Sequence, residues 1–153
     1  MDATFNLLPE AIGSISVATK HAILEQVATR FAGCYDLDQN AVLEGLEERE
    51  ALGSTGFGRG VAIPHARIDG IIRPSAVFLR LEKPVDYAAA DGMPVDLVFG
   101  LLSPVNAGIS HLHALAAISR IVRDEKVHQA LADAPDAEAI FALLTNASER
   151  DAA

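Results

Sequence analysis

A histidine behind a glycine-rich segment is the main candidate for chemistry in this chain. The segment reads R-E-A-L-G-S-T-G-F-G-R-G-V-A-I-P-H-A-R from Arg49 to Arg67, with His65 directly after Pro64. It contains the glycines Gly53, Gly56, Gly58 and Gly60. Glycine lets a backbone turn through positive φ and approach a ligand closely, whereas proline restricts the chain. We therefore predict a loop that brings a ligand to a firmly held imidazole at His65.

The charge distribution favours an anion at this segment. The whole chain is acidic, with 12 Lys+Arg against 21 Asp+Glu and a formal net charge of -9. This balance argues against general binding to nucleic acid, which relies on basic residues that neutralise phosphates. Between Ala51 and Ile68, however, there are two arginines and no acidic residue. The segment is predicted to be locally cationic on an acidic protein.

Two common nucleotide-binding motifs do not fit the spacing. A Walker-type loop needs Gly-Lys-Ser/Thr between a strand and a helix, and this segment has no lysine. The dinucleotide fingerprint needs G-x-G-x-x-G, whereas Gly56 to Gly60 reads G-x-G-x-G. No nucleotide cofactor is expected.

A neutral imidazole suits phosphoryl chemistry. With an unperturbed pKa near ~6.5 it is a nucleophile at neutral pH, and attack on phosphorus gives a reactive phosphorus–nitrogen bond. Cations and N–H donors must then stabilise the transferring group. We expect Arg49 at the end of a helix and His111 in the first turn of another, close to free backbone N–H groups. The residues therefore predict an anion site with a reactive histidine.

Structural explanations of the same residues stay open at this point. His65 beside a proline is compatible with a structural or exposed residue, Arg49 with a helix-end cation, and His111 with a capping or surface position. Arg59 and Arg67 are compatible with residues that solubilise a loop.

The other histidines do not predict a metal site. His111 and His113 are two residues apart on the expected helix, so their side chains do not face each other and cannot readily chelate one ion. His21 and His128 have polar neighbours and are expected at the solvated surface.

Five helices are predicted along the chain. The first runs from an N-cap at Thr19 to a stop at Gly33, and a second begins near Asp38 and ends with Arg49. After the loop of 103–108, a helix capped by Ser110 is expected. Two further helices are predicted over 124–132 and 136–146. The first fifteen residues, interrupted by proline and glycine, remain unassigned.

Three strands are predicted. Val61–Ile63 is short, with His65 just beyond its end, and Ser75–Leu81 alternates like a half-buried strand. Val95–Leu102 is nearly continuous apolar sequence, typical of a central strand covered on both faces. The fold class is therefore α/β, a single domain over residues 1–153 with its core at about 7–146.

Location is inferred from what the chain lacks. No apolar run approaches the roughly 20 residues that span a bilayer. Cys34 is the single cysteine and no secretory signal opens the sequence. A cytoplasmic protein without membrane insertion is expected.

Four motifs, in order, resemble one known family. They are L-G-S-T-G-F-G-R-G-V-A-I-P-H-A, E-K-P-V-D, D-G-M-P-V-D-L-V-F and H-L-H-A-L-A-A-I-S-R. From about Leu7 to Leu144 the chain resembles the fructose/mannitol-type (type-2) EIIA domains of the bacterial phosphoenolpyruvate-dependent phosphotransferase system, and among these the nitrogen-related EIIA proteins. The departures are Ala66 in place of a frequent glycine and Phe57 in place of a smaller aliphatic residue.

The resemblance implies a mixed β-sheet flanked by helices. It also implies a phosphohistidine carrier whose role is mainly regulatory. His65 would accept phosphate from an HPr-like protein, with His111 beside it and Arg49 holding the phosphoryl group. Further phosphoryl contacts would come from Ser54, Thr55 and Gly56. No metal or cofactor is implied, and the regulated targets would be proteins such as transporters or kinases.

Two other functions stay open. One is a sugar-transport EIIA component that passes phosphate to an EIIB domain and on to fructose or mannitol. The other is a binding-only module that has lost phosphotransfer.

Overall fold

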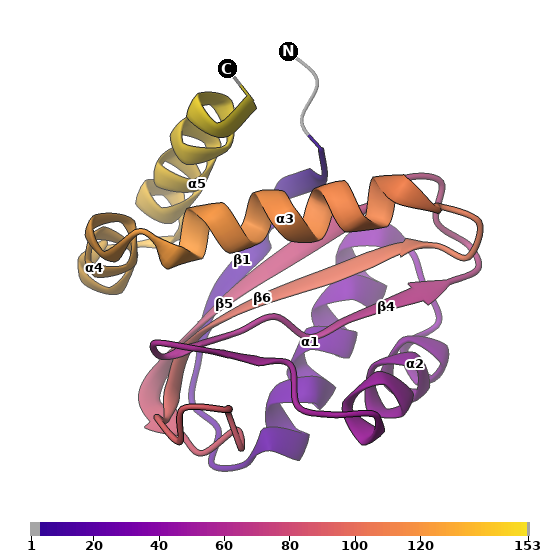
Figure 1. The fold of residues 1–153 in the computed structure, drawn as a ribbon, viewed down its shortest axis with the longest axis horizontal. Helices are drawn as coiled ribbons and strands as arrows, with labels where there is room; N and C mark the ends of the chain where they lie inside the picture. The colour runs from indigo at the N-terminus through magenta and orange to yellow at the C-terminus, as the bar shows by residue number, and fades with distance from the viewer. Residues whose placement is uncertain (1–3, 153) are drawn as a thin grey trace.

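The computed structural model describes residues 4–152, with 149–152 described by their backbone alone. Within this range a mixed six-stranded sheet lies between two layers of helices (Figure 1). The strands are β1 (Asn6–Ile15), β2 (Gly56–Gly58), β3 (Val61–Ala62), β4 (His65–Ile68), β5 (Ser75–Val85) and β6 (Val95–Pro104). The helices are α1 (Lys20–Tyr35), α2 (Gln39–Ala51), α3 (Ile109–Arg123), α4 (Glu125–Asp133) and α5 (Ala137–Ala152). The α/β class and the mixed sheet are confirmed.

The sheet is organised around β6. The strand order is β1-β5-β6-β3-β2, and β4 also pairs with β6, beyond β3. Strands β3 and β4 both run parallel to β6, whereas β5 runs antiparallel to it. Val98 on one face of β6 and Phe99 on the other are both fully buried, as predicted for a central strand covered on both faces.

Each face of the sheet has its own apolar core. Helices α1 and α2 cover one face, and α3 with α5 and α4 covers the other (Figure 1). The prediction that β5 is only half-buried is wrong. Val77 packs on the α1 side and Phe78 on the α3 side, and both have no exposed surface. A layer of helices on each face explains why the alternation in β5 does not separate core from solvent.

Strand β1 lies in the region that sequence reasoning left unassigned. It pairs in parallel with β5, and the register shifts between Leu7 and Ile12, around Pro9. Proline has no N–H for a ladder hydrogen bond and is tolerated on an edge strand, which is the position of β1 in the sheet.

The predicted helix ends are partly correct. The Thr19 hydroxyl accepts the Ala22 N–H at 3.1 Å and caps α1 as expected. The helix continues past Gly33 and ends at Asp36, which adopts a left-handed conformation with φ of 56°. One glycine costs a helix only about 1 kcal/mol, less than the packing of the helix face provides.

The predicted start of α3 and the preceding loop are also corrected. Strand β6 extends to Pro104, so the loop is shorter than expected. The N-cap of α3 is Gly108, which has a φ of 56° and no side chain. Ser110 lies inside the helix, and its hydroxyl donates to the Ala107 carbonyl at 2.9 Å. A left-handed glycine can turn the chain into a helix without a side-chain cap.

No helix in the described part of the chain is both long enough and apolar enough to cross a membrane.

Candidate functional site

The position of His65 depends on a break between two strands. Strand β3 pairs with β6 through Ala62 and Val98, and β4 resumes the pairing at His65 and Leu101. Pro64 lies in the gap because it lacks an N–H to continue the ladder, although its carbonyl accepts the Leu101 N–H at 3.0 Å. His65 is thus the first residue of β4, whereas the sequence predicted it beyond a strand end without a following strand.

Hydrogen bonds at both ring nitrogens fix the state of the His65 imidazole. Nδ1 lies 2.7 Å from the Ile63 carbonyl oxygen, and a carbonyl only accepts, so Nδ1 carries the proton. Arg49 Nε donates to Nε2 at 3.3 Å, so Nε2 presents its lone pair. The neutral Nδ1–H tautomer leaves Nε2 as the nucleophilic nitrogen.

The surroundings keep this imidazole neutral. Burial lowers the pKa of His65 below its usual 6.5, and the charges of Arg49 and Arg67 lower it further. The hydrogen bond to Ile63 and the charge of Glu50 act in the opposite direction without reversing the shift. At neutral pH the ring is therefore available as a nucleophile.

His111 completes a pair of histidines. Its ring lies 5.6 Å from the His65 ring, centroid to centroid, in the first turn of α3 as predicted. It is 4% exposed, and its Nδ1 forms a 2.6 Å hydrogen bond with the Ser103 hydroxyl of β6. Burial, together with the charges of Arg67 and His65, lowers its pKa to about 4. With Nδ1 engaged, Nε2 is the nitrogen with which His111 can meet a phosphoryl group.

Arg67 is a site residue whose importance sequence reasoning missed. Residues two apart in a strand point to the same face, so Arg67 follows His65 on one side of β4. It is exposed, and its charge acts on both His65 and His111. The alternation in H-A-R-I is the signal that identifies it, once this segment is taken as a strand.

The Ser54–Gly56 turn is held by its own hydrogen bonds. The Thr55 N–H donates to Glu50 at 3.0 Å, and the Thr55 hydroxyl also bonds the Glu50 carboxylate. The Gly56 N–H donates to the Ser54 hydroxyl at 3.1 Å. Direct phosphoryl contacts from these residues would require an exchange of partners and stay a prediction. The Glu50 carboxylate therefore lies against the segment that was predicted to be locally cationic.

The remaining histidines lie apart from this pair. His113 is exposed, and His21 lies within 3.6 Å of Glu25 and 3.3 Å of Glu47, at the surface as predicted. Within the described residues no group of three or more His, Cys, Asp or Glu side chains could hold a metal ion.

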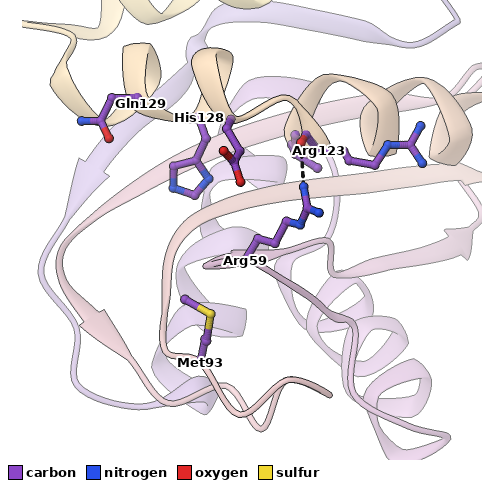
Figure 2. A pocket seen from close by; sticks show the side chains of 7 residues that line it. Arg59, Met93, Arg123, His128 and Gln129 are labelled. Atoms are coloured by element: carbon purple, nitrogen blue, oxygen red, sulfur yellow. Dashed lines mark hydrogen bonds between the residues drawn. The ribbon is translucent and has the colours of Figure 1, made fainter.

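A concavity of about 380 Å³ lies at the end of α3 away from His111 (Figure 2). Its lining residues are Arg59, Met93, Val122, Arg123, Glu125, His128 and Gln129. Arg59 donates to the Arg123 carbonyl at 3.2 Å. His128, predicted at the solvated surface, is only partly exposed, since 20% of its side chain is exposed and its Nε2 lies 3.2 Å from Asp96. From His111 to Arg123 the helix rises ~18 Å, so this pocket is not part of the histidine site.

Comparison with known proteins places these residues in a family. The family described as "Phosphoenolpyruvate-dependent sugar phosphotransferase system, EIIA 2" matches residues 10–147. A "Nitrogen regulatory protein" of Bradyrhizobium diazoefficiens is 41% identical over 145 residues, which is 94% of this chain and 95% of that protein. A "PTS system fructose-specific EIIA component" of Haloferax volcanii is 36% identical over 112 residues, 73% of each chain.

The fold agrees with these relatives. The crystal structure of nitrogen regulatory protein IIA-Ntr from Neisseria meningitidis superposes with a TM-score of 0.85 at 35% identity, covering 90% of this chain and 95% of the other. A family match over residues 10–147 and relatives that span nearly the whole chain show that this protein belongs to the EIIA 2 family of the phosphoenolpyruvate-dependent sugar phosphotransferase system.

Proposed function

We propose that the protein is a phosphocarrier of a nitrogen-related phosphotransferase system, working in the cytoplasm and accepting a phosphoryl group on Nε2 of His65. The observation that carries this proposal is the unprotonated Nε2, which faces the Arg49 guanidinium while Nδ1 is tied to Ile63. The nitrogen regulatory proteins similar to this chain support the nitrogen branch.

The transfer step exchanges one phosphorus–nitrogen bond for another. The Nε2 lone pair of His65 attacks phosphorus on the donor phosphohistidine, and the donor's P–N bond breaks with its electron pair returning to the donor imidazole. No proton has to leave Nε2, and the positive charge that develops on the ring is shared with Nδ1–H, whose bond to the Ile63 carbonyl strengthens. No metal, nucleotide or other cofactor takes part.

Three side chains are assigned to the transferring group. Arg49 shifts its Nε–H from Nε2 to a phosphoryl oxygen, Arg67 contributes a second positive charge, and His111 acts through its Nε2. Charge stabilisation of this kind supplies most of the catalysis in phosphoryl transfer.

Exposed apolar side chains beside these residues support a protein as the phosphate donor. Leu52 follows the end of α2 and is 85% exposed, and Ile109 and Leu112, next to His111 in the chain, are 67% and 58% exposed. EIIA proteins of this family work with HPr-like or EIIB partners. Large exposed apolar side chains of this kind are typical of a protein-binding surface. An HPr-like carrier is assigned to this surface.

The phosphorylated state would act as a signal. A phosphoryl group adds negative charge to a surface that also binds partners, and this changes which proteins dock there. Transporters and kinases are the proposed classes of target.

A sugar-transport component is the second candidate, because the Haloferax volcanii relative is named as a fructose-specific EIIA component. A binding-only module is less well supported, since it has no use for an unprotonated His65 Nε2 paired with Arg49.

The test is phosphate transfer from phosphoenolpyruvate through an enzyme I-type protein and an HPr-like carrier, read by intact mass. One acid-labile phosphoryl group is expected on wild type and on the control His113→Ala, whose residue is exposed on the same helix. None is expected on His65→Ala. Labelled His65→Ala would overturn the assignment, and an unlabelled wild type beside a charged carrier would favour the binding-only module. Rapid onward transfer to a sugar-type EIIB would favour the sugar branch.

A further inference from the structure

Glu50 has a buried carboxylate that the phosphoryl chemistry described above does not use. It lies near the end of α2, directly after Arg49, and its side chain is 7% exposed. One carboxylate oxygen accepts the Thr55 N–H at 3.0 Å and lies 2.9 Å from Lys20 Nζ. The other bonds the Thr55 hydroxyl and accepts the Tyr87 hydroxyl at 3.2 Å.

This carboxylate is kept ionised by its partners. Burial alone raises the pKa of Glu50, but the hydrogen bonds from Thr55 and Lys20 outweigh it and lower the pKa below its usual value. Lys20 also lies 4.5 Å above the Tyr87 ring, so the first residue of α1 and the β5–β6 connection both hold Glu50 in place. A carboxylate that accepts hydrogen bonds from four donors is held in one position, and it therefore fixes the position of the groups that donate to it.

The anchor reaches His65 through the backbones of two residues, Thr55 and Ile63. Glu50 fixes Thr55, the Thr55 carbonyl accepts the Ile63 N–H at 3.0 Å, and the Ile63 carbonyl bonds Nδ1 of His65 at 2.7 Å. The orientation of the Ile63 carbonyl decides whether Nδ1 has an acceptor. Glu50 is therefore linked to the choice of tautomer, and so to whether Nε2 carries a lone pair.

The adjacent residues Arg49 and Glu50 thus act on the two nitrogens of one imidazole. Arg49 reaches Nε2 directly, whereas Glu50 reaches Nδ1 through Thr55 and Ile63. We propose that Glu50 is a positioning residue for phosphoryl transfer. It holds His65 in the Nδ1–H tautomer by anchoring Thr55, whose carbonyl accepts the Ile63 N–H. This inference rests on the proposed phosphocarrier function.

The test compares Glu50→Gln with wild type in two independent measurements. The first is the tautomer and pKa of His65 in the unphosphorylated protein, read from imidazole ¹⁵N shifts during a pH titration. In wild type the Nδ1–H form is expected, and in the variant a mixture of tautomers with a lower pKa, since the Glu50 charge raises the His65 pKa. The second is single-turnover transfer from a phosphorylated HPr-like carrier, expected to slow by about 10- to 100-fold, the size of a positioning error at a reacting atom.

Two further variants separate positioning from general destabilisation. Glu48→Gln, an exposed position on the same helix, is the matched control and should keep the wild-type rate and tautomer. Thr55→Val keeps Glu50 bound to Lys20 and Tyr87 but removes the hydroxyl link, and is expected to slow transfer by about 3- to 10-fold, as for one lost hydrogen bond. If circular dichroism shows that Glu50→Gln is not folded, Thr55→Val is the variant that tests the positioning role.

The outcomes are distinct. Folded variants with a wild-type His65 tautomer overturn the positioning role even if transfer slows, because Glu50 then acts by another route. Wild-type transfer rates in Glu50→Gln and Thr55→Val also overturn it. If wild type itself takes no phosphate on His65, the proposed function fails, whereas the tautomer measurement still decides whether Glu50 positions the ring.

Discussion

Acid is expected to destabilise the fold through His111, and the effect can be isolated with one substitution. The His111 imidazole is 4% exposed, and its pKa falls from 6.5 to about 4 on folding, chiefly because of burial. The unfolded chain therefore takes up a proton as the pH falls through 6.5, whereas the folded protein does so only near 4. Because the unfolded state binds more protons in this window, stability decreases as the pH falls from 6.5 towards 4.

The magnitude follows from the two pKa values. One pKa unit corresponds to about 1.4 kcal/mol, so the full shift is worth about 3 kcal/mol. At about pH 4.5, where the folded ring is still mostly neutral, His111 alone lowers the free energy of unfolding by about 2.5 kcal/mol relative to neutral pH. This is a large fraction of the stability of a typical domain.

Urea unfolding of wild type and His111→Gln at several pH values measures this contribution. Glutamine does not titrate and retains a hydrogen-bonding group for Ser103, so the variant is expected to lose about 2.5 kcal/mol less than wild type between pH 7.5 and 4.5. Carboxylates titrate in both proteins and cancel in the difference. The control His113→Gln, at an exposed position, is expected to follow wild type. Parallel stability curves for wild type and His111→Gln would refute this account of His111.

Three further predictions concern the site and its loop. Because the His65 pKa is lowered, single-turnover phosphorylation should be independent of pH above 6.5 and fall only in more acid solution; a decline centred above 6.5 contradicts the assigned environment. Arg49→Met should slow transfer by about 10²-fold in rapid-quench measurements, as for a lost oxyanion donor, and an unchanged rate would remove it from the mechanism. Gly56→Ala should lower the free energy of unfolding by about 1–3 kcal/mol, because a Cβ there would lie 2.7 Å from Ala89 Cα. The control Gly33→Ala meets open space in α1 and should stabilise by about 0.5–1 kcal/mol, and equal effects would contradict the steric argument.

Elements with strong local signals were predictable from the sequence, and elements that depend on distant partners were not. The Thr19 cap and the apolar run of β6 are local, and both were predicted. Strand β1 carries Pro9 and Gly13, and it forms because β5 supplies the other half of its hydrogen bonds from sixty-odd residues away. No pattern within the first fifteen residues contains that information.

The same distinction applies to the site. His65, Arg49 and His111 were predicted as site residues from the glycine segment and from the resemblance to a family. The fold brings the centroids of the two histidine rings to 5.6 Å from each other. Sequence reasoning did not single out Glu50, because its partner Tyr87 is 37 residues further along the chain. Arg67 carried a usable signal in the strand alternation of H-A-R-I, which was hidden by the expectation that β3 ended the sheet pairing.

The central claim is that Nε2 of His65 accepts the phosphoryl group, and the position of the phosphorus measures it most directly. Wild-type protein with ¹⁵N-labelled histidine would be phosphorylated by its HPr-like carrier and examined by ¹⁵N and ³¹P NMR in alkaline solution, where phosphohistidine persists. The geometry predicts a single phosphohistidine, at His65, with phosphorus bonded to Nε2. Phosphorus on Nδ1 of His65, or on His111 instead, would contradict the account.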